Sequence, residues 1–393
     1  MAVIDLAQYK YTLELDSSQY SNGMKAAEEQ AEGMKTKLSG VGSFLKTSLV
    51  AGMAAAGAAI VGTVVKGVQS ADELTQAMNS FQAATGVAAD SIDEYSEAMK
   101  NIYAANLGED FEDIADAMTT ITQTTKDLNP SNVEQLTKNA LALRDTFDFD
   151  INESMRAVNM LIDQFGISGE EAFNLIAQGA QGGLDKNGDL LDSINEYSVH
   201  FKQLGLDAED MFNSLANGAD AGAFSVDKVG DALKEFGIRV KDGSTNDVFL
   251  QLGLDAENTA QAFAEGGEAA SSAFSEVTRK LFEMQDPLSQ NQAGVALFGT
   301  MWEDLGAEGV QALTNLTGSI DASKNSMERI NSIKYNSFGE AMQGIGRQLE
   351  TGLLLPLGEQ VLPLLNTFGA RLSNNLSKNR SSQSLQEFPV RYL

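Results

Sequence analysis

A short unit occurs twice in the middle of the chain, and this repeat is the feature that most constrains the fold. Residues 165–179 align without gaps with residues 204–218. A weaker third copy covers residues 252–266, and in every copy a second glycine follows the first after 13 residues. One short helical unit cannot bury its apolar face alone, so units of this kind stack on their neighbours. The repeat therefore predicts an array of helices and not a fold built around a catalytic pocket.

Each copy carries the signals of a turn between two helices. Its first glycine follows an apolar run, where a helix commonly ends on a left-handed residue that glycine adopts at little cost. Two residues later, a serine or an aspartate can accept a hydrogen bond from the first N–H groups of the next helix. The glycines are Gly166, Gly205 and Gly253, and the capping residues are Ser168, Asp207 and Asp255.

Two of the copies also have the spacing of a capping box. Ser168 with Glu171 fits it closely, and Asp207 with Asp210 is a looser version. We expect the second glycine of each copy to end its helix; these residues are Gly179, Gly218 and Gly266. The alternative interpretation is an ordinary helical bundle that uses the same caps without a repeated architecture.

The negative charge of the chain is concentrated in its middle. The net charge is −28, yet residues 67–322 alone carry 13 Lys+Arg and 44 Asp+Glu, so the two flanks together are slightly basic. An acidic region of this kind repels phosphates and lacks the basic stripe that backbone binding needs. We therefore expect no direct nucleic-acid binding by the acidic core. The absence of cysteine excludes disulfides and thiolate metal ligands, and no secretory signal is recognisable at the start.

Five segments are predicted along the chain. They are a strand plus a helix at 1–43, an Ala/Gly-rich apolar helix at 44–70, an acidic helical core at 71–320, helices at 321–372 and a disordered tail at 373–393. The 5 prolines and 36 glycines favour long helices with glycine stops. The predicted fold is mainly all-α, a helical hairpin array or bundle with long flanking helices and one short N-terminal strand.

The predicted strand rests on residues 9–16, where apolar and polar side chains alternate. A lone strand leaves its backbone unpaired, so we expect it to pair with another chain or another copy. Further along, Asp72 is expected to cap a helix that ends at Thr85. A second helix is expected from Ser91 to Leu107, and Asn129 with Pro130 predicts a break and a new helix start.

An uncharged run lies between Lys46 and Lys66. Residues 47–65 reach the lower length limit of a membrane-spanning helix, but six of the 19 residues are alanine and three are glycine. Ala54, Ala58 and Gly62 recur at a spacing of four, which lets helices approach closely. Two interpretations follow: a segment that enters a bilayer, or a helix buried in a multi-chain bundle. The weak apolarity of the run favours the buried helix.

Chemistry-bearing residues are few. His200 is the only histidine, so it cannot supply the paired ligands of a zinc hydrolase, and no nucleophile elbow, Walker loop or dinucleotide fingerprint is present. His200 could serve as a general base, but a position on a helix face without a catalytic role is the simpler interpretation. Trp302 is expected to be a core anchor. We accordingly predict no enzyme activity and no catalytic, cofactor-binding or metal-binding residue.

One acidic group resembles a calcium loop. Positions 1, 3, 5 and 12 of the loop template are matched by Asp185, Asn187, Asp189 and Glu196. The sixth position requires glycine for the sharp turn, but Leu190 stands there and Gly188 comes too early. A turn that leads into a helix capped by Asp189 or Asp192 explains the same residues.

Several longer motifs resemble a known family. They are residues 161–166, 183–192, 197–201, 226–236 and 296–304, the last containing Phe298-Gly299-Thr300-Met301-Trp302. These motifs are similar to the conserved core of the phage tail tape measure proteins of Gram-positive siphophages and their prophages. The opening strand and helix and the Ala/Gly-rich segment also resemble the N-terminus of that family. The resemblance covers residues 1–370 or so, and it carries no catalytic signature.

The resemblance implies a structural role. Tape measure proteins are elongated, multi-copy helical proteins inside the growing tail tube, and their length sets the length of the tail. Tail-assembly chaperones wrap them before the tail-tube subunits polymerise, and they leave the virion ahead of the DNA. Apolar segments of the family are thought to contact the host membrane and help the genome across it. We therefore expect this chain in the tail lumen of the virion, in the host cytoplasm during assembly, and at the host membrane during infection.

Length distinguishes this chain from its family, whose members generally continue further and sometimes carry a peptidoglycan-cleaving domain. We expect a shortened form: a prophage remnant, a fragment or a short-tailed system. As one continuous helix, the chain would span at most roughly 590 Å at about 1.5 Å per residue. Three hypotheses follow: a structural tail component, a membrane-active protein acting through residues 47–65, or a cell-wall enzyme that depends on His200.

Overall fold

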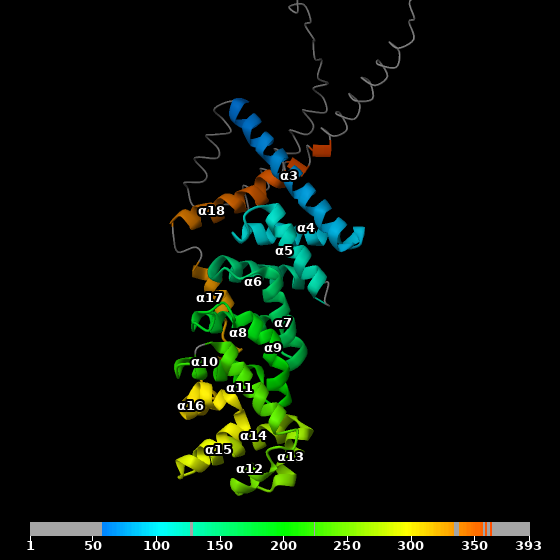
Figure 1. Ribbon diagram of the computed structural model, residues 1–393. Helices are drawn as coiled ribbons and strands as arrows, with labels where there is room; N and C mark the ends of the chain where they lie inside the picture. Colours follow the sequence, from blue (N-terminus) through cyan, green and yellow to red (C-terminus); the bar gives the residue numbers. More distant parts are fainter. Residues whose placement is uncertain are drawn as a thin grey trace, which may run out of the picture. The chain divides into compact units, whose positions relative to one another are not determined.

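The computed structural model describes residues 57–125, 129–223, 225–333, 338–356, 358–359 and 362–363. All regular secondary structure in these ranges is helical (Figure 1), which confirms the prediction of a mainly all-α chain. The predicted strand and helix at 1–43 and the predicted tail at 373–393 lie outside the described residues.

The chain separates into two compact units. One combines residues 1–76 with 346–393, and the other is residues 77–345. The first unit contains most of α3 (Gly57–Thr85) and the π-helical η5 (Glu350–Leu354). Here the backbones meet closely, because a Cβ atom added to Gly67 would lie 2.5 Å from the carbonyl oxygen of Leu354. The five predicted segments of the chain stay a prediction.

The second unit carries the repeats. Its elements include the end of α3 and the start of α18 (Phe338–Leu349). Between them lie η3 (Ala89–Ser91), α4 (Ile92–Ala104), α5 (Phe111–Thr124), α6 (Pro130–Phe147), α7 (Ile151–Phe165), α8 (Gly169–Gln181), α9 (Leu190–Gln203), α10 (Ala208–Asp220), α11 (Val226–Arg239), α12 (Asn246–Gln251), α13 (Ala256–Glu265), α14 (Gly267–Phe282), α15 (Pro287–Phe298), α16 (Thr300–Leu313) and α17 (Ser326–Ile333).

The helices of this unit stack in two rows. In one row α5, α7, α9, α11 and α15 pack on each other in succession, and in the other row α4, α6, α8, α10 and α16 do so. Figure 1 shows the chain passing from α4 to α12 and then returning beside its earlier helices through α15, α16 and α17. On the return, α16 packs on α10, and α17 packs on α8 and α6. This is the stacked array that the repeat predicts.

Aromatic side chains fill the core where the chain turns back. The ring of Phe236 lies 5.0 Å from that of Phe298, 5.2 Å from Phe274 and 5.6 Å from Phe263. Trp302 is buried next to this group, and its indole N–H donates to the amide oxygen of Asn291 at 2.8 Å. The prediction that Trp302 is a core anchor is therefore confirmed.

Some of the predicted helix boundaries are wrong. Asp72 does not cap a helix start, since it lies inside α3 and accepts a hydrogen bond from the side chain of Gln76 at 2.7 Å. The helix continues through it because Ala71 and Leu74, on either side, are buried, and packing stabilises a helix more than its local propensity does. The second helix begins after Ser91 as expected but ends at Ala104, before Leu107. The end at Thr85 and the start at Pro130 are confirmed.

Two of the second glycines of the repeat do not end their helices. Gly179 lies inside α8 and Gly218 inside α10, and each helix continues for two more residues. Both glycines are packing positions. A Cβ atom on Gly179 would lie 3.1 Å from the ring of Phe212, and one on Gly218 would lie 2.6 Å from the side chain of Val229. Only in the third copy does the second glycine follow directly on a helix end, where Gly266 follows α13.

Candidate functional site

The turn of the repeat is formed as predicted in all three copies. Gly166, Gly205 and Gly253 have φ angles of +73°, +74° and +76°, in the left-handed region. The capping oxygens of Ser168, Asp207 and Asp255 each accept the N–H of the residue three positions later. The first two copies contain complete capping boxes, including the one that the sequence predicts only loosely. These bonds fix where α8 and α10 begin, and so determine which side chains lie on each face of these two helices.

That face carries side-chain amides at repeated positions. Asn174 and Gln178 of α8 correspond in the alignment to Asn213 and Asn217 of α10. A spacing of four residues places both members of a pair on the same side of their helix. Asn174 and Asn213 are buried, with 3% and 6% of their surface exposed. We call these four residues the amide ladder.

The amide ladder contacts a non-helical segment that connects α16 to α17. We call residues 314–322 the strap. The amide of Gln178 donates to the carbonyl oxygen of Asp321 at 2.8 Å and accepts the N–H of the same residue at 3.2 Å. Asn213 makes the same pair of bonds with Ile320, at 3.3 Å and 3.2 Å. Each of these amides therefore satisfies both main-chain groups of one strap residue.

Further bonds hold the ends of this connection. Asn217 donates to the carbonyl oxygens of Asn315 at 2.6 Å and Thr317 at 3.0 Å. The hydroxyl of Ser214 donates to the carbonyl oxygen of Leu313, a carboxylate oxygen of Glu209 accepts the N–H of Ala322, and Asn174 accepts the N–H of Met327. All these bonds end on main-chain atoms, either of the connection or of the helix residues Leu313 and Met327 beside it. The ladder therefore binds the backbone of this segment and not its side chains.

Three strap residues are nevertheless restricted in size or polarity by their surroundings. Ile320 and Ala322 are buried, with 9% and 7% of their surface exposed. Gly318 lies against Asn213, since a Cβ atom at this position would come within 2.1 Å of the amide oxygen. The strap is therefore recognised through its backbone, and its small and apolar residues decide which segment fits.

The third copy has no such contact. Its Gln261 stands where Asn213 stands in the second copy, but it is exposed and donates to Glu265 of the same helix at 2.8 Å. The turn and cap are thus common to three copies, whereas the ladder is formed in two. Sequence reasoning missed the ladder because it assigned the repeat to caps and turns. The signal was present, as amides recur at the same two positions in the first two copies.

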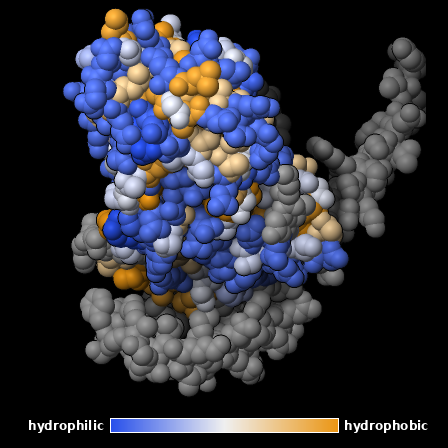
Figure 2. Space-filling view, turned by 90° about the horizontal axis from the view of Figure 1, so that it is seen from below, coloured by the Kyte–Doolittle hydropathy of each residue, from blue (hydrophilic) through white to orange (hydrophobic). Residues whose placement is uncertain are grey.

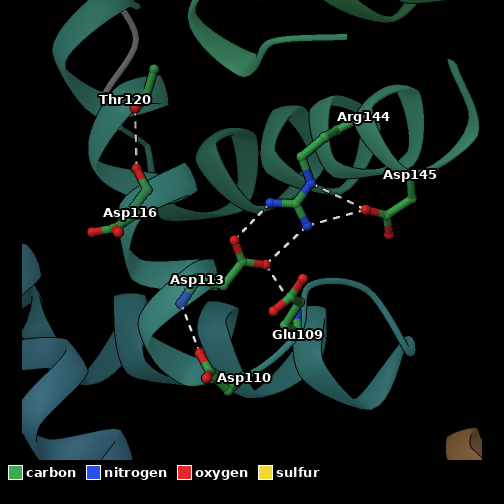
Figure 3. Close-up of polar contacts among 7 residues, drawn as sticks. All are labelled: Glu109, Asp110, Asp113, Asp116, Thr120, Arg144 and Asp145. Carbon is green, nitrogen blue, oxygen red and sulfur yellow. Dashed lines mark hydrogen bonds and ion pairs between the residues drawn. The ribbon is translucent and has the colours of Figure 1, made fainter. Parts of the chain in front are cut away.

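A second polar group lies between α5 and α6 (Figure 3). The guanidinium of Arg144 pairs with both carboxylate oxygens of Asp113, at 2.6 Å and 2.9 Å, and with Asp145 at 3.1 Å. This bidentate geometry, with two carboxylates beside it, raises the pKa of Arg144. Asp113 also accepts the N–H of Glu109 at 2.9 Å, so the ion pair is tied to the start of α5.

Arg144 and Asp113 border a hollow of about 510 Å³. Three further aspartates line it: Asp116, Asp148 and Asp150. This surplus of carboxylates would attract basic groups. Across the part of the chain that the structure describes, no three acidic or histidine side chains are placed to hold a metal ion.

The residues of the calcium-loop hypothesis do not converge. The carboxylate of Asp185 accepts the N–H of Leu190 at 3.0 Å, and Glu196 pairs with Lys234 of α11 at 2.7 Å. Asp189 directly precedes α9, but its side chain makes no capping bond to that helix. Burial raises the pKa of both Asp185 and Asp189. The turn is closed by Asp185, and not by the predicted cap at Asp189.

His200 lies half-buried on α9. Burial lowers its pKa, and the nearby charge of Lys234 adds to this effect. On the same helix, the hydroxyl of Tyr197 donates to Asp227 at 2.8 Å and to Asp231 at 3.1 Å. Burial and these two carboxylates raise the pKa of Tyr197. This polar group joins α9 to α11.

The surface seen from below is mostly hydrophilic, with smaller hydrophobic patches (Figure 2). The exposed large apolar residues of α11, α12 and α15 are Ile238, Leu250 and Leu288. Within the described residues, no helix combines the length and the apolarity needed to cross a membrane. The predicted membrane segment at 47–65 is therefore not supported, and residues 47–56 of it lie outside the described residues.

Comparisons with known proteins point to one group. A family model described as phage-related minor tail protein matches residues 103–299, which include all three copies of the repeat. A probable tape measure protein of Streptomyces phage phiC31 is 32% identical over 255 residues, which are 62% of this chain and 34% of that protein. The chain thus spans about a third of the length of this curated relative. No solved structure gives a match.

Proposed function

Because the chain belongs to the phage tail tape measure protein family, we propose that it is a structural component of a phage or prophage tail that acts inside the tail tube. Its partners in this proposal are the tail-tube subunits, the tail-assembly chaperones and further copies of itself. The observation that carries the proposal is the stacked helical array of residues 77–345, which contains the whole region matched by the family model. An array of hairpins offers long surfaces for protein contacts.

We propose further that the chain contributes to tail length through stacked hairpins in this region. A ruler made of one extended helix advances about 1.5 Å per residue. The helices between residues 77 and 345 are instead short and folded back on each other, with α6 of 18 residues the longest one contained wholly within them. A hairpin added to a stack lengthens it by about one interhelical distance, 8–10 Å.

The two geometries give different answers to one experiment. Gly166 and Gly205 lie 39 residues apart, so deleting residues 167–205 removes one repeat period. The full chain and the deletion variant are co-expressed with the tail-tube subunit of the same phage, and tube lengths are measured by electron microscopy. An extended ruler predicts tubes shorter by about 58 Å, and a hairpin stack predicts a loss of about 10 Å.

The control duplicates the same 39 residues, which should lengthen the tubes by a matching amount. Tubes of unchanged length in both variants would remove the measuring role. Failure of the chain to associate with tubes at all would remove the tail role as well.

A further inference from the structure

We propose that α8 and α10 form a peptide-binding site for a non-helical main chain, and that the strap of a second copy of this chain can occupy it. The site consists of the amide ladder with Glu209 and Ser214, and in the structure the strap of the same chain fills it. The proposal rests on the proposed function in one respect: an assembly of many copies brings straps and ladders of different chains close together.

The chemistry of the contact is that of peptide recognition. An amide side chain carries a donor and an acceptor, so it can pair with both the N–H and the carbonyl group of one non-helical residue. Gln178 does this with Asp321, and Asn213 does it with Ile320. The repeat places these two amides on successive helices of the stack, so adjacent strap residues are held by adjacent hairpins. Gln178 and Asn213 are not equivalent in the alignment, but their aligned partners Asn217 and Asn174 also bond main-chain atoms of the returning chain. Both amide positions of both copies are therefore used, which a single fortuitous loop contact would not require.

The site also selects the segment it binds. Gly318 leaves no room for a side chain beside Asn213, and Ile320 and Ala322 are buried. The matching ligand is therefore a non-helical segment with a glycine two residues before an isoleucine and a small residue two residues after it. Every copy of this chain carries that segment between α16 and α17.

Nothing in the bonds depends on which copy supplies the strap. Thr317, Ser319 and Ser323 are exposed and make no bond to the ladder through their side chains. Release of the strap therefore uncovers the apolar contact of Ile320 and Ala322 but does not change the surroundings of these three side chains. Its own chain supplies the strap at an effective concentration of about millimolar, so exchange is disfavoured in dilute solution. Parallel copies confined in one assembly reach a comparable local concentration, and identical elements then exchange at low cost.

The first experiment opens the site in the full chain. Gly318→Val removes the fit of the strap beside Asn213 and changes no ladder residue. A labelled peptide of residues 312–325 is added, and its binding is followed by fluorescence anisotropy. We expect Gly318→Val to bind the peptide at least about tenfold more tightly than the unmodified chain, whose site is already filled.

Matched controls identify the site. Adding Gln178→Ala and Asn213→Ala to the Gly318→Val chain should weaken binding about tenfold or more, since buried main-chain groups then lose their partners. Adding Gln261→Ala, in the third copy, should change nothing. A peptide that carries the valine should not bind. Equal binding by the ladder variant, or no gain in the Gly318→Val chain at unchanged helicity by circular dichroism, would refute the peptide site.

The second experiment tests exchange between copies. The Gly318→Val chain has an open ladder, and the Gln178→Ala/Asn213→Ala chain has an intact strap that its own ladder holds poorly. Mixed together, the two should form a one-to-one complex by native mass spectrometry, in excess of any association of either variant alone. No excess in the mixture would overturn exchange between copies. The tail role is tested separately by tube length, so the two proposals can fail independently.

Discussion

The first two copies of the repeat and the third share a turn but differ in what their helices hold. In all three, a left-handed glycine and a capping side chain start the second helix. In the first two, the amide face of that helix is covered by the strap, whereas Gln261 of the third copy faces solvent. A repeat can therefore conserve its local geometry while the surface it presents changes from one copy to the next.

The largest expected effect is a difference in the free energy of unfolding between alanine substitutions at the equivalent glycines of the second and third copies. Gly205 and Gly253 share the same φ, but a Cβ atom on Gly205 would lie 1.9 Å from the carbonyl oxygen of Gly267, while Gly253 has open space. Gly253→Ala should cost about 1–2 kcal/mol, the strain of the left-handed region alone. Gly205→Ala should cost about 3–5 kcal/mol, because the backbone of α14 must also move. Urea unfolding measures both.

Gly166→Ala provides the control for this pair. Its φ is +73°, and nothing lies near the added atom. Its cost should equal that of Gly253→Ala. If Gly205→Ala cost no more than these two substitutions, close packing at this glycine would not distinguish the second copy from the other two.

The next effect concerns the ladder. Asn213→Ala leaves the N–H and the carbonyl group of Ile320 without their partner in a buried place, which should cost about 2–4 kcal/mol. Gln261→Ala in the third copy should stay within about 0.5 kcal/mol, as is usual at exposed positions. Denaturant unfolding gives the free energies, and hydrogen exchange of the Ile320 amide should speed up only in the first variant. Similar costs for both would contradict the difference between the copies.

Loss of the helix cap should have a smaller effect on stability, and the effect should be similar in the first and third copies. Ser168 and Asp255 each cap the helix after the turn through one N–H group. Replacement by alanine should cost about 1 kcal/mol at either position. Thermal unfolding of the two variants should give similar shifts, and a clear inequality would mean that the caps are not equivalent. Threonine at the same positions is the control, because its hydroxyl can still accept the bond.

The smallest effect is a difference in pH dependence between the two capping boxes. The hydrogen bonds from the N–H and the hydroxyl of Ser168 lower the pKa of Glu171, so this carboxylate stabilises the fold above its usual value of 4.5 and ceases to do so as the pH falls. Burial raises the pKa of Asp210, with Asp207 and Glu209 nearby, so its contribution is present at low pH and is lost as the pH rises through the folded pKa.

Substitution by the neutral amide tests these signs. Glu171→Gln should lose stability relative to the unmodified chain mainly above pH 4.5, and the gap should close towards lower pH. Asp210→Asn should show the opposite trend. Unfolding free energies measured from pH 3 to 7 distinguish the two, and parallel curves would rule out the difference between the boxes.

Much of the helical framework could be predicted from the sequence. The starts after Ser168, Asp207, Asp255 and Asn129 follow from hydrogen bonds to residues two or three positions away, so a local pattern is enough to place them. The predicted helix ends at Gly179 and Gly218 are wrong because glycine there serves packing against a helix or ring elsewhere in the chain. A glycine in a sequence does not reveal which of these two roles it has.

The amide ladder shows where this limit lies. Its recurrence can be read in the first two copies, but Gln178 and Asn213 find their partners 143 and 107 residues further along the chain. The sequence alone determined the helices, their caps and the turns that stack them, because those interactions are local. Only the tertiary structure decided which face of the stack is covered and by which segment, because that depends on where the returning chain lies in space.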